Sequence, residues 1–196
     1  RGGYPQIYSR PDTGYSDQWL ADYFSSYVDR DIRNLFPGLN INNYRLLIRF
    51  LAELNGEQIN NSDMARSLSV SEATVRNYLE IANGSFIWRK LPSYQRSSLR
   101  SVSKMPKGVI RDPGLARVLA LVGSKEKLEQ YPKIGSLFES FVIEELIKGL
   151  QLKSKSLLNF YYFRNKVGIE VDFIAEGSFG VLPIEIKMAN NTSVKD

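Results

Sequence analysis

The residue types that could carry out chemistry at a metal ion gather in the last third of this chain. Asp172 lies in a strand-like run over residues 170–175, and Glu185 and Lys187 lie in another over residues 181–188. Side chains alternate between the two faces of a β-strand, so Glu185 and Lys187 are expected to share one face. A glycine-bounded turn between the two runs would return the second strand beside the strand that bears Asp172.

Two carboxylates and a lysine on one sheet face can bind Mg²⁺ and activate a water molecule for phosphodiester hydrolysis. We therefore predict Asp172 and Glu185 as metal ligands and Asp172, Glu185 and Lys187 as catalytic residues. Glu139, in a predicted helix over residues 135–150, is expected to add a further catalytic carboxylate. The alternative is an exposed sheet face on which Glu185 and Lys187 form only an ion pair with each other.

Composition limits the chemistry further. The 196-residue chain has no cysteine and no histidine, which excludes disulfides, thiol nucleophiles, histidine bases and metal sites built from either residue. Any metal would be held by oxygen ligands, which favours Mg²⁺ or Mn²⁺. A net charge of +5 suits an anionic partner. No apolar run has the length of a membrane span and no signal peptide is seen, so we expect a cytoplasmic protein without a membrane partner.

The elements that must position these carboxylates are a helix and three strands. The helix over residues 135–150 is amphipathic, with the apolar residues Phe138, Phe141, Val142, Leu146 and Ile147. The predicted strands cover residues 158–164, 170–175 and 181–188. The order of one helix and three strands is that of a PD-(D/E)XK nuclease core, so we predict a partial restriction-endonuclease-like α/β core. It is incomplete because the chain stops soon after Lys187.

The first two thirds of the chain are predicted to be helical. Apolar residues at spacings of three and four predict helices over residues 17–35, 46–54, 62–68 and 72–83. Ser62 and Ser71 are the expected N-caps of the last two helices. Those two helices have the spacing of a helix-turn-helix, with Val70 in the turn, and the strands expected over 86–94 and 107–112 would form the wing of a winged helix. The fold class is therefore α+β.

In a DNA-binding helix-turn-helix, the second helix enters the major groove. We predict that Thr74, Arg76 and Asn77 on that helix contact nucleic acid, together with Arg89 and Lys90 on the wing. Between residues 89 and 111 the chain has seven Lys or Arg residues and no acidic residue, which favours this interpretation.

The alternative for this segment is a three-helix core that does not touch DNA. Glu72 and Glu80 lie on the same helix as the predicted contact residues and would repel phosphate.

We divide the chain into a linker over residues 1–16, a helical and winged-helix domain over 17–132, and a nuclease-like domain over 133–196. The chain begins with Arg1, and the first residues are expected to be the end of an upstream module, so we expect a piece of a longer protein. A Gly-x-x-x-x-Gly-Lys-Ser/Thr loop is missing from the sequence, so we expect no ATP site in it.

Several segments in this order resemble a prokaryotic family in which an AAA-type ATPase module is followed by the domain of unknown function 4143. The matching segments cover residues 2–5, 27–32, 61–79, 104–107, 112–115, 135–142, 170–173 and 184–187. Val171 departs from the pattern, because it stands where the nuclease motif has proline. The resemblance implies a winged helix, a PD-(D/E)XK core and an upstream ATPase module in the parent chain.

We therefore expect the nucleic-acid-binding module of an AAA-type ATPase, with duplex DNA as its partner. It would be a Mg²⁺-dependent nuclease or a degenerate relative of one. The alternative is a non-catalytic scaffold for protein interaction or oligomerisation. A salt-dependent affinity for duplex DNA would separate the two, because phosphate contacts release counterions.

Overall fold

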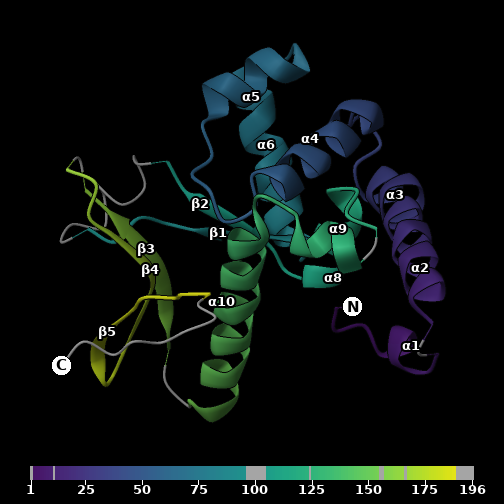
Figure 1. Ribbon diagram of the computed structural model, residues 1–196. Coiled ribbons are helices and arrows are strands. Elements are labelled where there is room, and N and C mark those ends of the chain that lie inside the picture. Colours follow the sequence, from purple (N-terminus) through teal and green to yellow (C-terminus); the bar gives the residue numbers. More distant parts are fainter. Residues whose placement is uncertain are drawn as a thin grey trace.

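The structure is a computed structural model that describes residues 2–10, 12–95, 105–123, 125–154, 157–165 and 167–188. Within these ranges the fold is α+β, as predicted, with helices and two small antiparallel sheets. The long helix α10 (Ile134–Lys153) stands between the three-stranded sheet and the helices of the first two thirds of the chain (Figure 1). The helices of the described ranges include none that is long and apolar enough to cross a membrane.

The N-terminal helical rod confirms the helix predicted over residues 17–35 but begins earlier. It consists of α2 (Thr13–Ser26), the π-helical segment η1 (Tyr27–Ile32) and α3 (Arg33–Leu35). Asp12 caps its start by accepting a hydrogen bond from the backbone N–H of Gly14.

The segment predicted to be a linker is packed against this rod. It contains the short helix α1 (Pro5–Tyr8), and Ile7 is fully buried. The ring of Tyr4 lies 5.3 Å from that of Trp19, between centroids. Aromatic and aliphatic side chains in the segment have apolar partners, so burial holds it in place.

Three helices and a hairpin follow in the order predicted. The helices are α4 (Ile41–Glu53), α5 (Asn61–Leu68) and α6 (Glu72–Gly84), and the antiparallel strands are β1 (Trp88–Leu91) and β2 (Lys107–Ile110). Gln58, between α4 and α5, forms an isolated antiparallel bridge with Lys107.

The cap of α6 is confirmed and the cap of α5 is corrected. Ser71 accepts a hydrogen bond from the backbone N–H of Thr74, at 3.1 Å. The N-cap of α5 is Asn60, not Ser62, because the Asn60 side chain accepts the N–H groups of Ser62 and Asp63. Because Asn60 is the N-cap, α5 begins at Asn61, one residue before the predicted start at Ser62.

The short helices α8 (Pro113–Leu119) and α9 (Lys125–Glu129) lead to α10. One hydrophobic core joins α2, α4, α5, α6 and α8. Its fully buried members include Leu20, Tyr44, Leu47, Val75 and Trp88.

The second sheet has the order β3-β4-β5, with β3 (Asn159–Arg164), β4 (Glu170–Gly177) and β5 (Gly180–Ile184), all antiparallel. The predicted hairpin between β4 and β5 is present, with Gly177 opposite Gly180. β5 is shorter than predicted, because it ends at Ile184 instead of residue 188.

The apolar residues from which helix α10 was predicted are buried to different extents. Phe138 and Phe141 are 37% and 43% exposed, whereas Ile143 and Ile147 are fully buried. The helix is apolar over much of its circumference, so periodicity predicts the helix but does not separate its buried apolar side chains from its exposed ones.

The two predicted domains share a core. Leu91 and Val109 of the hairpin pack in the same cluster as Ile143, Tyr162 and Phe173. The chain beyond β1 also pairs with β3, since the backbone N–H of Tyr94 donates to the carbonyl of Tyr162 at 2.6 Å. The hairpin is therefore packed between the helical part and the three-stranded sheet.

Candidate functional site

The predicted carboxylate site is built around a lysine that the sequence analysis did not single out. Lys107, the first residue of β2, is only 2% exposed. Its Nζ forms an ion pair with Glu139 of α10 and lies 3.4 Å from Glu170 Oε1 and 4.0 Å from Asp172 Oδ1, both on β4. We call these four residues the Lys107 cluster.

The Lys107 cluster lines a cavity of about 450 Å³, which also contacts Gln58 and Arg164. Arg164 Nη1 lies 3.7 Å from Glu170 Oε2, so Glu170 faces two cations. Burial raises the pKa of Glu139, and the nearby charge of Lys107 only partly offsets this effect. The cluster is therefore a partly desolvated group of acids with its own internal cation.

Asp172 of β4 lies beside the segment of the chain that bears Glu185 and Lys187. Its Oδ2 accepts the backbone N–H of Ile186 at 2.8 Å, so the chain after β5 runs beside it. The structure thus brings Asp172 and Glu139 together around Lys107 and places residues 185–187 next to them.

Glu185 and Lys187 lie close together, as predicted, and form the ion pair of the alternative interpretation, but they do not lie on a strand. Both lie beyond the end of β5, so the alternation of side chains along a strand does not apply to them. Lys187 Nζ lies 2.5 Å from Glu185 Oε1, and their side chains are 74% and 48% exposed. The Glu185 hydrogen bond and charge are the main causes that raise the pKa of Lys187, with smaller contributions from Asp172 and Glu139.

The Mg²⁺ ion that the nuclease-like resemblance implies does not fit the Lys107 cluster as it stands. The lysine ammonium contacts the carboxylates that a metal ion would need, and Glu185 is paired with Lys187. In the sequence, Lys107 was marked by its place in the acid-free run of residues 89–111 and by the matching segment 104–107. Nothing local indicated that it would be the buried member of that run.

The predicted nucleic-acid residues of α6 lie on its solvent side. Arg76 and Asn77 are exposed and Thr74 is half-buried. Arg76 Nη1 lies 3.6 Å from Glu72 Oε2 on the preceding turn. The hydroxyl of Thr74 hydrogen-bonds to that of Ser71. The exposed surface of α6 therefore has one guanidinium, one amide and two carboxylates, Glu72 and Glu80.

The two predicted wing residues have different surroundings. Lys90 is exposed, and its Nζ lies 2.8 Å from Glu80 of α6. Arg89 points into the protein and forms an ion pair with Glu144 of α10, which is only 1% exposed. Arg89 therefore holds a buried carboxylate, which leaves Lys90 as the more accessible of the two. Residues 96, 100 and 104, the other basic positions between the strands, lie outside the described residues.

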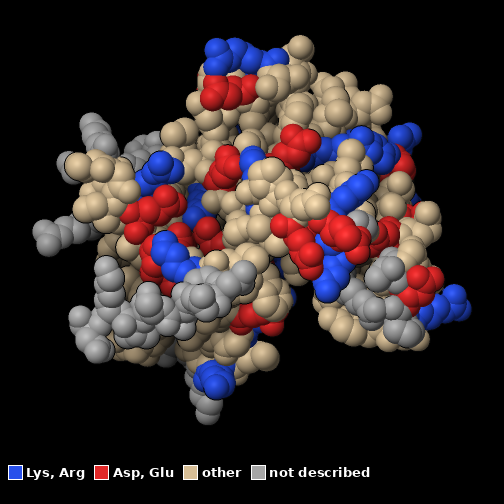
Figure 2. Space-filling view, viewed as in Figure 1, with Lys and Arg blue, Asp and Glu red and all other residues tan. Residues whose placement is uncertain are grey.

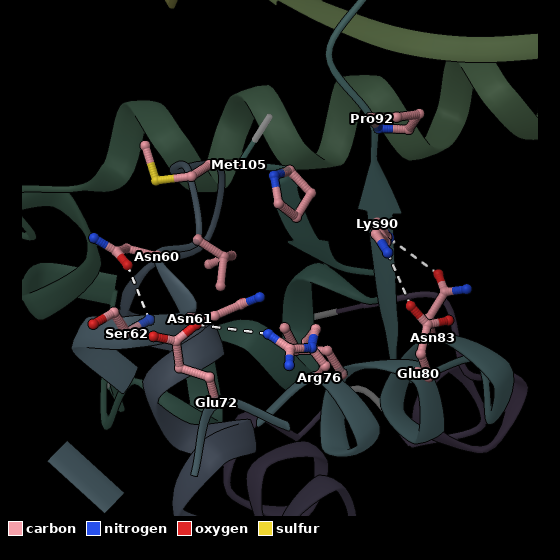
Figure 3. Close-up of a pocket in the computed structure, with 13 residues that line it drawn as sticks. Asn60, Asn61, Ser62, Glu72, Arg76, Glu80, Asn83, Lys90, Pro92 and Met105 are labelled. Atoms are coloured by element: carbon pink, nitrogen blue, oxygen red, sulfur yellow. Dashed lines mark hydrogen bonds and ion pairs between the residues drawn. The ribbon is translucent and has the colours of Figure 1, made fainter. Parts of the chain in front are cut away.

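A groove of about 690 Å³ runs between α5, α6 and the end of β1 (Figure 3). Its polar lining contains the pairs Glu72–Arg76 and Glu80–Lys90 and the amides of Asn60, Asn61 and Asn83. Its apolar lining contains Ile59, Leu79, Pro92, Met105 and Pro106.

Acidic and basic side chains alternate on the face of the molecule shown in Figure 2. Over the region between the three-stranded sheet and α10, red and blue side chains lie next to one another. On this face the charges of the two signs are therefore interspersed.

Comparison with known proteins assigns the two parts of the chain to two profiles. The profile of DUF8612, a domain of unknown function, matches residues 1–126, more than half of the chain. The chain belongs to the DUF8612 family. Residues 134–196 of this DUF8612 chain match the profile of DUF4143, a second domain of unknown function. The predicted resemblance to DUF4143 is thus confirmed for the last third alone. The predicted boundary at residue 132 falls between the two matched ranges.

Two curated relatives of this DUF8612 chain are uncharacterized proteins of Mycobacterium bovis and Mycobacterium tuberculosis. Each is 28% identical over 194 residues, covering 99% of the chain and 43% of the relative. The chain therefore spans less than half the length of these relatives. No solved structure matches it significantly.

Proposed function

We propose that the DUF8612 part of the chain forms a winged helix that binds duplex nucleic acid through α6 and the β1–β2 hairpin. The observation that carries this proposal is the exposed side of α6, where Arg76 lines one groove together with Lys90 of the hairpin and Asn77 also faces solvent. A helix that presents polar side chains next to an exposed lysine of a hairpin can enter the major groove while the hairpin contacts phosphates.

The order of the elements supports a winged helix. Three helices precede a two-stranded antiparallel hairpin, and the segment between the first two helices pairs with the second strand through Gln58. The turn between α5 and α6 is tight, with Ser69 in the left-handed region at φ 54°. The backbone N–H of Val70 donates to the carbonyl of Ala65 and closes this turn.

The ion pairs of Arg76 and Lys90 do not prevent phosphate binding. Both pairs are exposed, with basic side chains 58% and 41% exposed. Exposed ion pairs of this kind contribute between about 0 and 1 kcal/mol. A phosphate can therefore replace the carboxylate as the partner of either cation at small cost.

The proposal is tested by measuring the affinity for a duplex DNA at several salt concentrations. The protein with Arg76→Ala and Lys90→Ala is compared with the wild type. We expect weaker binding and a logarithmic salt slope that is smaller by about 1 for each phosphate that the variant no longer neutralises. Lys148→Ala is the matched control, because Lys148 is an exposed lysine paired with Glu145 on another helix.

Unchanged affinity and slope in the double variant would reject DNA binding by α6 and the hairpin. The Arg89→Ala variant is unsuitable for this test, because removing Arg89 leaves the buried Glu144 without one of its partners.

Base recognition within this proposal is assigned to Asn77 and Thr74. Asparagine can form two hydrogen bonds with adenine in the major groove, and a good pair of this kind discriminates by about 1–3 kcal/mol. The Asn77→Ala variant should therefore reduce the preference for a selected site and leave non-specific binding unchanged.

A scaffold function is the second candidate, and one observation favours it. Leu35 and Phe36 are 69% and 39% exposed and line a hollow of about 730 Å³ together with Thr74 and Asn77 of α6. Exposed apolar side chains beside a hollow are typical of protein contacts. If this surface joins two copies, sedimentation velocity should show self-association that disappears on replacing Leu35 and Phe36 by Ser.

We propose that the DUF4143 part is a degenerate relative of a PD-(D/E)XK nuclease that does not cleave DNA by itself. Glu139 and Asp172 face Lys107, and Glu185 is paired with Lys187 on the surface. The upstream ATPase module of the parent chain is also a proposal and rests on the family resemblance. Mg²⁺-dependent nicking of supercoiled DNA by the full-length protein, abolished by Glu185→Ala or Lys187→Ala, would contradict the proposed degeneracy.

A further inference from the structure

We propose that Lys107 is the resident cation of the carboxylate cluster and that it takes the place of a divalent metal ion there. Its ammonium group would keep Glu139, Glu170 and Asp172 together without any bound ion. The cluster would then be a metal-independent joint between the hairpin and the C-terminal part of the chain. This inference does not depend on the proposed binding of DNA.

The first argument is the burial of the charges. Lys107 is 2% exposed, and the side chains of Glu139 and Asp172 are 18% and 12% exposed. A buried charge is costly unless an opposite charge lies against it. The lysine and the carboxylates therefore need one another, and the cluster cannot lose its cation without rearranging or taking up another.

The second argument is the geometry around Nζ. The ammonium group lies between acids from two elements, with Glu139 on α10 and Glu170 and Asp172 on β4. An ammonium group has three N–H donors and can serve three acceptors at once. A Mg²⁺ ion would need oxygen ligands at about 2 Å, and the Lys107 ammonium already makes the contact with Glu139. The positive charge of the ammonium group would also repel a divalent cation in the same position.

The third argument is that the other oxygen of Asp172 is already used by the protein. Oδ2 accepts the backbone N–H of Ile186, whereas Oδ1 faces Lys107. Both oxygens of this carboxylate therefore have partners within the chain.

The joint has a structural consequence for the hairpin. Lys107 starts β2, and Arg89 on β1 pairs with Glu144 of the same helix that bears Glu139. Two acidic residues of α10 thus hold one basic residue from each strand. The hairpin is fixed by charge as well as by its apolar contacts.

The test replaces Lys107 by Met, which has a similar length and no charge, and measures thermal unfolding with and without Mn²⁺. Binding of Mn²⁺ is followed in parallel by electron paramagnetic resonance. The wild type should bind no Mn²⁺ at the cluster, and its melting temperature should be the same with Mn²⁺ and with EDTA. The Lys107→Met variant should melt on the order of 10 °C lower, because acids are left buried without their partner. Mn²⁺ should bind it and restore part of the stability.

Lys148→Met is the matched control, because it removes a lysine from an exposed pair with Glu145. It should change neither the melting temperature nor the response to Mn²⁺. A Lys107→Met variant that is as stable as the wild type, or one that is destabilised but binds no Mn²⁺, would overturn the proposal.

A measurement on the wild type keeps the proposal testable if Lys107→Met does not fold. Wild-type protein that binds Mn²⁺, with binding abolished by Asp172→Asn, would show that the cluster accepts a metal ion beside the lysine. That result would also overturn the proposal. Wild-type protein that binds no Mn²⁺ at this position would support it.

Discussion

The guanidinium of Arg89 on β1 forms an ion pair with the carboxylate of Glu144 on α10, a side chain that is only 1% exposed. Arg111, just beyond β2, also approaches this carboxylate, with Nε 3.5 Å from Oε2. The buried acid therefore joins the hairpin to the long helix through two arginines. The predicted phosphate contact by Arg89 competes with this structural role.

Replacing Glu144 by Ala should lower the free energy of unfolding by about 3–5 kcal/mol, because two partly buried guanidinium groups lose their partner. The measurement is urea unfolding followed by circular dichroism. Glu145→Ala is the control, since the neighbouring Glu145 is exposed and pairs with Lys148. The control should change stability by less than about 1 kcal/mol. Equal effects of the two variants would contradict the structural role of Glu144.

The N-cap of α5 can be tested by mutation, because the structure assigns it to Asn60 and the sequence predicted Ser62. Asn60 accepts the first N–H groups of the helix, so Asn60→Ala should cost about 1 kcal/mol. Ser62 lies within the helix, and Ser62→Ala should change stability by less than about 0.5 kcal/mol. Chemical denaturation of the two variants measures the difference. The reverse order of effects would restore Ser62 as the cap.

The pH dependence of stability should report on Glu139. Burial raises its pKa in the folded protein above the value in the unfolded chain. The folded state therefore binds the proton more tightly, and the contribution of Glu139 is fully present below the unfolded pKa of about 4.3. This contribution disappears as the pH rises through the folded pKa.

The Glu139→Gln variant isolates this contribution, because glutamine resembles the protonated acid. Wild type and variant should have similar stability near pH 4, and the wild type should become relatively less stable as the pH rises towards about 7. Urea midpoints across this range provide the measurement. A wild type that gains stability over the variant with rising pH would show that Lys107 outweighs the desolvation of Glu139.

The sequence by itself determined the elements whose signals are local. Ser71 starts α6 because its hydroxyl accepts an N–H group three residues away. The turn between Gly177 and Gly180 joins neighbouring strands, and Gly180 adopts φ +94°, which favours glycine. Capping and tight turns depend on residues a few positions apart, so the chain alone indicated these elements and their order.

The tertiary structure decided which charged residues meet. Lys107 and Glu170 are 63 positions apart, and Arg89 and Glu144 are 55 positions apart. No spacing rule in the sequence links residues at such separations, and a lysine in a basic run has no local sign that it will be buried. β5 ends at Ile184, and beyond it the backbone N–H of Ile186 bonds to the side chain of Asp172, 14 positions away. Ion pairs and sheet edges depend on how distant segments dock, and docking is fixed by the burial of apolar surface across the whole fold.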